Sequence, residues 1–167
     1  MNVEDIKQLM DGFDPAALLP DLTTVAGKME LVCRIAVLIG PILLLVLGLI
    51  YLFLAPKEAN HRFGFRCYYG MGSVEAWRFT QRLAGLVWSG LGLILSIVML
   101  LSTMGLRKMS IVDQVWRCVK CLGWEAGLIL AAVLFIHIMA AVCFDKDGIR
   151  RPNAPKLDLN FNLKFKK

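Results

Sequence analysis

Three long stretches of this sequence contain no charged residue, although 19% of all residues are charged. They cover residues 35–56, 83–106 and 126–144. Each is about as long as the roughly 20 helical residues that cross a hydrocarbon core of about 30 Å. A charged side chain at the centre of a bilayer costs at least about 2.5 kcal/mol. These gaps in charge argue against a soluble protein and predict three membrane-spanning helices.

Several motifs of enzymes are also missing. The sequence has no Walker phosphate-binding loop, no glycine-rich dinucleotide turn and no His-Glu-x-x-His motif. It also has no internal repeat. We therefore expect a non-enzymatic protein without a cofactor. The uncharged stretches hold no carboxylate, which disfavours a proton or ion pathway built on acidic side chains. Accordingly, we expect no acidic side chain within the membrane-spanning helices.

Apolar residues make up 57% of the 167 residues, above the roughly 45–50% that is usual in globular domains. The expected fold is all-α, an integral membrane bundle of three transmembrane helices. We place its spans at about residues 35–56, 83–106 and 124–144, within a bundle that covers residues 22–144. An acidic amphipathic segment at residues 1–21 precedes the bundle, and a basic tail at residues 145–167 follows it.

The formal net charge of +6 is interpreted as membrane topology and not as a nucleic-acid-binding surface. Lysines and arginines are concentrated in the first loop and the C-terminal tail, which three spans place on the same side. The positive-inside rule assigns that side to the cytoplasm. We therefore expect a multi-pass membrane protein with its N-terminus outside and its first loop and C-terminus in the cytoplasm.

Prolines and short polar side chains predict where the helices bend and begin. Pro41 lies inside the first span, where its missing N–H predicts a kink, and Pro56 closes that helix. Ser73 is a favourable N-cap for a second helix running to about residue 104. Ser110 and Asp113 have the spacing of a capping box, which predicts the start of the third helix after a tight connection.

Small residues recur at helical spacing on two of the predicted helices. Such surfaces let helix backbones approach closely in lipid. These surfaces support association of helices without identifying the partner. The sets are Gly85, Ser89, Gly92 and Ser96 on the second helix, and Gly123, Gly127 and Ala131 on the third.

Two further side-chain groups in the third helix bear on chemistry. Cys118 and Cys121 have the spacing of a zinc or redox pair, but no second pair completes a four-ligand site. We therefore predict no metal and interpret both cysteines as packing residues. His137 is an ionisable group inside the third span, which is by default a functional hypothesis. We favour the alternative that a neutral imidazole is hydrogen-bonded to a neighbouring helix.

A specific pattern lies between the first two spans. Asn60 is followed by Gly64 and Arg66, and Trp77 comes eleven residues after Arg66. Arg82 and Gly85 then open the second span. This order and spacing resembles the SdpI family, bacterial membrane proteins named after an immunity protein against a secreted sporulation-delaying toxin. The resemblance covers roughly residues 55–105 and agrees with a loop between two spans.

The resemblance implies a protein of the bacterial cell membrane that provides immunity against a membrane-active peptide toxin. It also implies signalling, in which the cytoplasmic face recruits a transcriptional repressor. We expect the arginines to bind phosphate or carboxylate oxygens, Gly64 to permit a turn, and Trp77 to anchor at headgroup level. The alternative is that these are ordinary juxtamembrane charges and interfacial aromatics. The binding residues of this loop are Asn60, Arg62, Gly64, Arg66, Trp77, Arg82 and Gly85.

Two other functions remain open at this point. The small-residue faces suit a structural or accessory subunit of a membrane protein complex. A small oligomeric transporter is the third possibility, because three apolar helices line a polar path only as an oligomer. The expected partners are thus the lipid bilayer and a peptide toxin, a cytoplasmic repressor, another membrane protein or a second copy, and not a nucleic acid.

Overall fold

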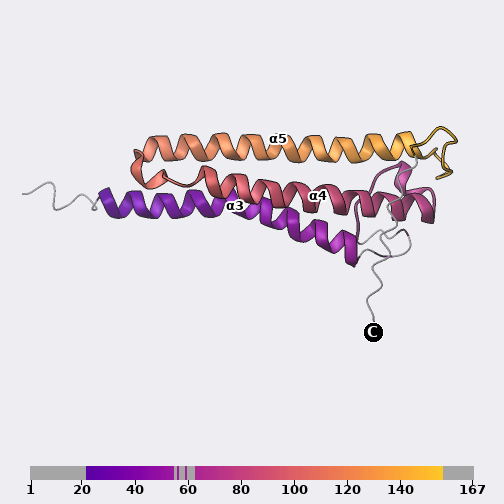
Figure 1. Cartoon of the computed structure of the whole chain (residues 1–167), viewed down its shortest axis with the longest axis horizontal. Helices are drawn as coiled ribbons and strands as arrows, with labels where there is room; N and C mark the ends of the chain where they lie inside the picture. Colours follow the sequence, from indigo (N-terminus) through magenta and orange to yellow (C-terminus); the bar gives the residue numbers. More distant parts are fainter. Residues whose placement is uncertain (1–21, 55, 57–58, 60–62, 156–167) are drawn as a thin grey trace, which may run out of the picture.

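The computed structural model describes residues 22–54, 56, 59 and 63–155. This part of the chain is all-α, as predicted, with helices α3 (Leu22–Phe53), α4 (Val74–Ser102) and α5 (Ile111–Cys143) (Figure 1). Two short 3-10 helices lie in the connections, η1 (Tyr69–Met71) and η2 (Leu106–Lys108). The expected amphipathic segment at residues 1–21 lies outside the described residues, as do Asn60 and Arg62.

Each of the three helices is long and apolar enough to cross a membrane. The candidate spans are Gly27–Phe53, Val74–Ser102 and Ile111–Cys143. Each begins earlier than the predicted span, because the helix continues from the uncharged stretch into more polar sequence. Glu125 lies just before the uncharged stretch at residues 126–144 but within the predicted span at 124–144, and it is buried in α5. The expectation that the spans hold no acidic side chain is therefore wrong.

The predicted helix starts are confirmed by hydrogen bonds. Ser73 caps α4, where its Oγ accepts a hydrogen bond from the backbone N–H of Ala76 at 3.1 Å. Ser110 caps α5 in the same way, accepting from the N–H of Asp113 at 3.2 Å. Both cap side chains satisfy a backbone donor that the first helical turn leaves unpaired.

The tight connection between α4 and α5 is held by a buried amide. Gln114 is buried, and its Nε2 donates to the carbonyl oxygens of Leu106 at 2.9 Å and Met109 at 3.2 Å. Gly105 enters the turn with a φ of 88°, a conformation that suits glycine. Helices α4 and α5 are thus long antiparallel neighbours, as the sequence predicts (Figure 1).

Glycines bring α3 and α4 into direct backbone contact. A Cβ added at Gly48 would overlap the backbone of α4. On α4, a Cβ at Gly85 would lie 2.7 Å from Cγ of Leu52, and one at Gly92 would lie 2.5 Å from the nitrogen of Leu45. The predicted packing of the small face of α4 is confirmed, because no larger side chain fits between the two helices.

The small face of α5 behaves differently. Gly123, Gly127 and Ala131 are exposed, and no atom lies within 4 Å of a Cβ added at either glycine. None of the described helices of this chain packs against that face. Its predicted association with a second copy or another membrane protein therefore stays a prediction.

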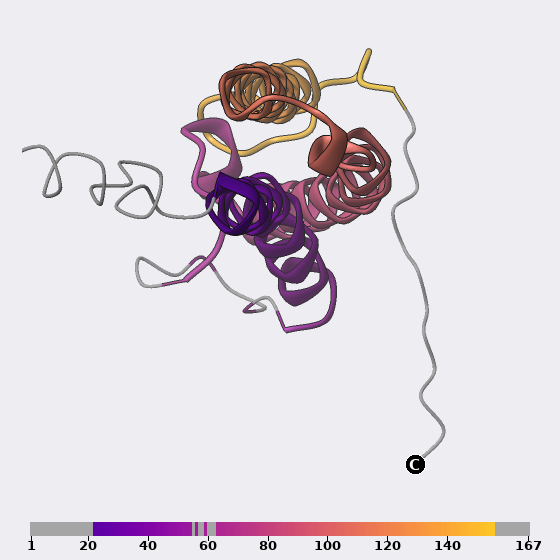
Figure 2. The same ribbon diagram turned by 90° about the vertical axis from the view of Figure 1, so that its left-hand side faces the viewer.

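Pro41 divides α3 into two parts. It is the one proline inside the helix, and the second half of α3 bends away from α5 while remaining beside α4 (Figures 1 and 2). A proline inside a helix removes one backbone hydrogen bond and commonly produces such a bend. The first half of α3 stays next to α5, where Sγ of Cys118 lies 3.8 Å from the carbonyl oxygen of Cys33.

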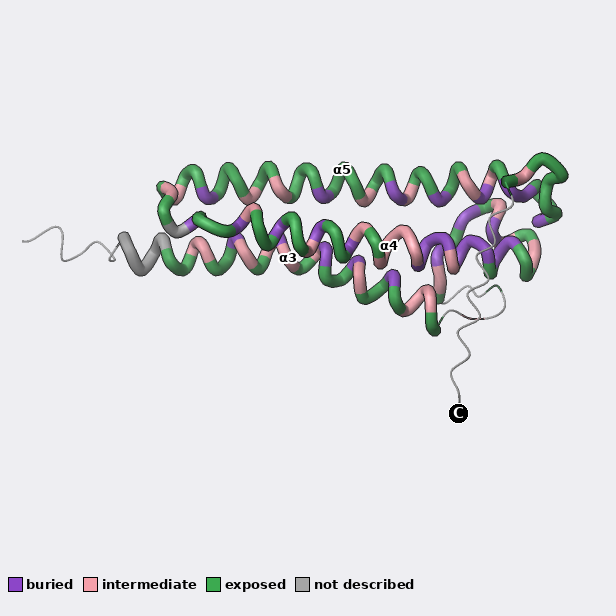
Figure 3. The backbone as a smooth tube through the Cα atoms, in the orientation of Figure 1, coloured by how far each residue is buried: buried purple, intermediate pink, exposed green. Residues whose placement is uncertain are grey.

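Buried residues form narrow inward lines along the helices, while the outer surfaces are exposed and apolar (Figure 3). One core cluster, near η2, contains Val37, Leu95 and Met99, and partly buried Cys118 and Cys121 pack against it. The cysteine pair therefore serves as packing, as predicted. A larger cluster at the other end of the bundle lies below the first loop. The exposed leucines, isoleucines and valines suit contact with lipid tails.

We expect Gly92→Ala to destabilise the bundle, because its Cβ would meet the fixed backbone of α3. Overpacking of this kind costs about 1–3 kcal/mol. The measurement is the thermal unfolding midpoint of the purified protein in detergent.

Gly90→Ala is the matched control, since Gly90 lies on the same helix and a Cβ there meets nothing within 4 Å. The control is expected to match or exceed the wild-type midpoint, because alanine favours helix by about 0.5–1 kcal/mol over glycine. Equal midpoints for both variants would contradict a close contact at Gly92.

Candidate functional site

The first loop folds back over the beginning of α4. Gly64 has a φ of 124°, in the region that favours glycine. A Cβ added there would also lie 2.7 Å from Cζ2 and Cη2 of Trp77, which belongs to the first turn of α4. Two of the predicted loop residues are therefore in direct contact, and glycine is required both for the backbone conformation and for the space.

Trp77 is 0% exposed, so its predicted role as a headgroup anchor is wrong. Its ring fills the space below Gly64, and its Nε1 donates a hydrogen bond to the carbonyl oxygen of Pro56 at 2.9 Å. A buried indole needs such a partner for its N–H. The same side chain thereby joins the residues after α3 to the first turn of α4.

Gln81, one turn after Trp77, fixes the loop backbone. Its Oε1 accepts a hydrogen bond from the N–H of Phe65 at 2.8 Å, and its Nε2 donates to the carbonyl oxygen of Phe65 at 2.7 Å. The side chain is 1% exposed, so these bonds form away from water, where an unpaired amide is costly. Sequence reasoning missed this role. The available signal was a polar side chain on the same helical face as a tryptophan.

A second buried turn follows Phe65. The N–H of Gly70 lies 3.1 Å from the carbonyl oxygen of Cys67 and 3.2 Å from its Sγ. Thr80 on α4 lies against the same thiol, at 3.9 Å between Oγ1 and Sγ. Burial raises the pKa of the Cys67 thiol, and its hydrogen bonds with Gly70 and Thr80 offset this only in part. The thiol is therefore a packing and hydrogen-bonding group and not a reactive thiolate.

The turn after α5 closes against the same end of α4. Oγ of Ser73 donates to the carbonyl oxygen of Gly148 at 2.7 Å, and a Cβ at Gly72 would lie 2.6 Å from the nitrogen of Gly148. Phe144 is buried and its ring lies 5.4 Å from that of Phe79. The first loop and residues 144–155 therefore lie at the same end of the bundle, as three spans require. Sequence reasoning did not find this contact.

Arg66 lies on the outside of this end. Arg66 is exposed, although both of its neighbours, Phe65 and Cys67, are buried. Arg82 is half-buried on α4. Gly85 does not join the loop, because it packs on α3 further along the helix. The described residues of the predicted set thus divide into Gly64 and Trp77, which contact each other, Gly85, which packs on α3, exposed Arg66 and half-buried Arg82.

His137 does not form the predicted bond to a neighbouring helix. Its Nδ1 donates to the carbonyl oxygen of Val133, one turn earlier in α5, at 2.9 Å. Its ring instead contacts the loop, packing edge to face on Phe65 with 5.3 Å between ring centroids. The prediction of an interhelical hydrogen bond is therefore wrong, although the ring does contact Phe65 of the first loop.

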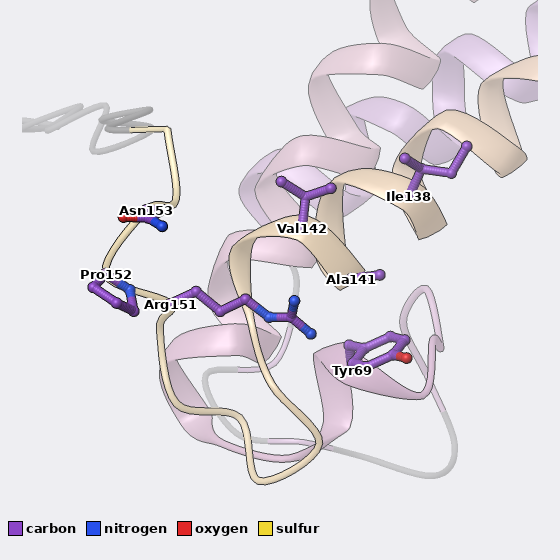
Figure 4. Close-up of a pocket in the computed structure, with 7 residues that line it drawn as sticks. All are labelled: Tyr69, Ile138, Ala141, Val142, Arg151, Pro152 and Asn153. Atoms are coloured by element: carbon purple, nitrogen blue, oxygen red, sulfur yellow. The ribbon is translucent and has the colours of Figure 1, made fainter.

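A cavity of about 600 Å³ opens beside this end of α5 (Figure 4). Ile138, Ala141 and Val142 form its apolar wall, Tyr69 borders it from the loop, and the Arg151 guanidinium extends toward the space between them. Arg151 also lies 4.0 Å from Oδ1 of Asp145. Among the described residues no cluster of three histidine, cysteine or acidic side chains is suited to hold a metal ion.

The fold and this site define a multi-pass, all-α membrane protein whose first loop is clamped onto the second span. Residues 57–144 match the SdpI/YfhL protein family. The match covers more than half of the chain, and the chain therefore belongs to this family, as the resemblance of its loop indicates. No curated protein and no solved structure matches the chain significantly.

We expect Gly64→Ala to loosen the loop, because the new Cβ meets the Trp77 ring and the backbone must keep a positive φ. The positive φ alone costs about 1–2 kcal/mol for an L-residue. The expected result is a lower unfolding midpoint and faster hydrogen exchange at the Phe65 amide.

Gly105→Ala is the control, because Gly105 also has a positive φ but a Cβ there meets nothing within 4 Å. It shares the backbone strain and lacks the contact with tryptophan. Equal losses of stability in the two variants, with Phe65 exchange unchanged, would show that Gly64 does not support the loop.

Proposed function

We propose that the chain is a non-enzymatic SdpI-like protein of the bacterial cell membrane that acts in immunity to a membrane-active peptide toxin and in the associated signalling. The observation that carries this proposal is the placement of Arg66. The backbone of Phe65, just before it, is held by two hydrogen bonds with the Gln81 side chain, and the Cys67 thiol after it is buried. The exposed guanidinium of Arg66 is thus carried by an ordered loop backbone at the end of the bundle.

A guanidinium in this position suits a carboxylate or phosphate partner. It offers a planar fork of donors that matches the geometry of both groups. A loop that is already ordered loses less conformational entropy on binding than a flexible loop does. The loop therefore favours recognition of an acidic group on a protein or peptide over catalysis.

The basic residues of this end support a cytoplasmic location for the first loop and the C-terminal turn. Arg66, Arg150 and Arg151 all lie at the end where the loop meets that turn. The positive-inside rule then places the N-terminus outside. In this orientation the loop end faces a cytoplasmic repressor, while the spans face a toxin in the membrane.

The proposal predicts that expression of the chain protects a sensitive bacterium against the peptide toxin. Arg66→Ala is expected to reduce protection about tenfold or more, since a charge-assisted hydrogen bond contributes about 1.5–3 kcal/mol. Survival across a toxin dilution series is the measurement, with membrane levels of each variant compared by immunoblot.

Lys146→Ala is the matched control, because Lys146 is another exposed cation in the turn after α5. It is expected to protect as well as the wild type. Unchanged killing in cells that express the wild-type chain would contradict immunity. Equal protection by Arg66→Ala would remove Arg66 from the mechanism.

The exposed small face of α5 favours one alternative, an accessory subunit of a membrane protein complex. Its glycines contact nothing within the described chain. This alternative predicts that a second membrane protein copurifies in mild detergent and is lost with Gly127→Leu. Recovery of the wild-type chain alone, as a single species, would contradict it.

A further inference from the structure

One acidic side chain lies in the interior of the bundle. Glu125 is near the middle of α5, is only 5% exposed, and belongs to a helix that is long and apolar enough to cross a membrane. Its Oε2 has no hydrogen-bond partner among the described residues. An ionisable group at such a depth is costly and is by default a candidate functional group.

The side chain is directed at the bend in α3. A Cβ added at Gly40 would overlap Oε1 of Glu125 and would lie 2.9 Å from its Cδ. The next residue is Pro41, which has no N–H to donate to the carbonyl of Val37, one turn earlier. Glycine thus opens a space for the carboxyl group, and proline leaves a carbonyl acceptor on the same helix.

No cation neutralises this carboxyl group from any of the three helices. On α3 the nearest basic residue is Arg34, about 9 Å along the helix axis from Gly40, and its Nη2 is held 2.8 Å from Oε1 of Glu30. Helix α4 holds no charged residue from residue 83 to its end at Ser102. On α5 the nearest titratable group facing the core is Cys121, one turn earlier, and Lys120 is exposed.

A buried carboxylate without a cation or a hydrogen bond at Oε2 is strongly disfavoured. The neutral acid removes the cost of burying an unpaired charge. The arrangement therefore selects one ligand, a proton. A divalent metal has too few ligands here, since no cluster of three candidate side chains exists in the described residues.

We propose that Glu125 is a proton-binding site in the membrane interior, held neutral in the closed bundle against the Gly40–Pro41 bend of α3. When the proton leaves, the carboxylate needs water or a cation, and α3 moves away from α5 to admit it. The bend is the place where the two helices already begin to part (Figure 1). This proposal is independent of Arg66 and of the function assigned to the loop.

The first experiment records infrared spectra of the full chain in lipid vesicles at near-neutral pH. The difference between the wild type and Glu125→Gln is expected to contain the carbonyl band of a protonated carboxylic acid. Glu75→Gln is the control, because Glu75 is exposed at the loop end and is expected to show only a carboxylate band. A carboxylate band alone for Glu125 would overturn the proposal.

The second experiment measures the unfolding midpoint against pH. If the closed bundle binds one more proton than the unfolded chain, its stability falls as the pH rises. The ratio of folded to unfolded protein then changes by up to about tenfold for each pH unit. Glu125→Gln is expected to remove this part of the slope, and Glu75→Gln to keep it. The same slope in Glu125→Gln as in the wild type would also overturn the proposal.

If the Gln variant does not insert or fold, the wild-type chain carries the test on its own. Carbon-13 labelling of the glutamate carboxyl groups distinguishes acid from carboxylate by chemical shift. One glutamate is expected to remain an acid at near-neutral pH, with a contact to α3 at Gly40. Ionisation of all glutamates at that pH would contradict a membrane-interior proton site.

Discussion

The close backbone contact between α3 and α4 is the constraint on which the rest of the structure depends. In lipid, helices gain little from the hydrophobic effect and associate through dispersion contacts where small residues allow close approach. Gly48, Gly85 and Gly92 provide that approach along much of the interface. It fixes the end of α3 beside the start of α4, so that the loop between them can return over α4. The hydrogen bond from Trp77 to Pro56 is possible only in this register.

The loop is stabilised by buried polar groups rather than by a strand or a disulfide. Gln81 pairs with both backbone groups of Phe65, as a neighbouring strand would, and Trp77 fills the space that Gly64 leaves. These hydrogen bonds are shielded from water, so breaking one would leave a buried polar group unpaired at a high cost in free energy. The loop is therefore held in one conformation. This separates two roles within the family pattern. Glycine and tryptophan maintain the shape, and Arg66 presents a charge.

Local features of the fold could be predicted from the sequence, because they depend on neighbours within one or two turns. Ser73 and Ser110 cap their helices by bonding an amide three residues away, and Pro41 acts on its own helix. Trp77 could not be assigned in the same way. Tryptophan at the edge of a span is equally compatible with a lipid interface and with a core, and only the loop above it decides. The role of Gln81 could not be assigned from the sequence for the same reason, since the backbone groups that it binds belong to Phe65, sixteen residues away.

Glu125 shows what an average over a hydrophobic stretch cannot detect. Its helix is apolar enough to span a membrane in spite of one acidic side chain, and nothing in α5 itself indicates where that side chain points. The direction of the side chain depends on α3, where only a glycine at position 40 leaves room for the carboxyl group. The bundle does pair charge elsewhere, since Arg34 binds Glu30 near the η2 end. A leucine at position 125 would avoid the burial cost altogether. An unpaired acid placed against Gly40 at the helix bend therefore fits the proposed role in binding a proton better than a role in stability.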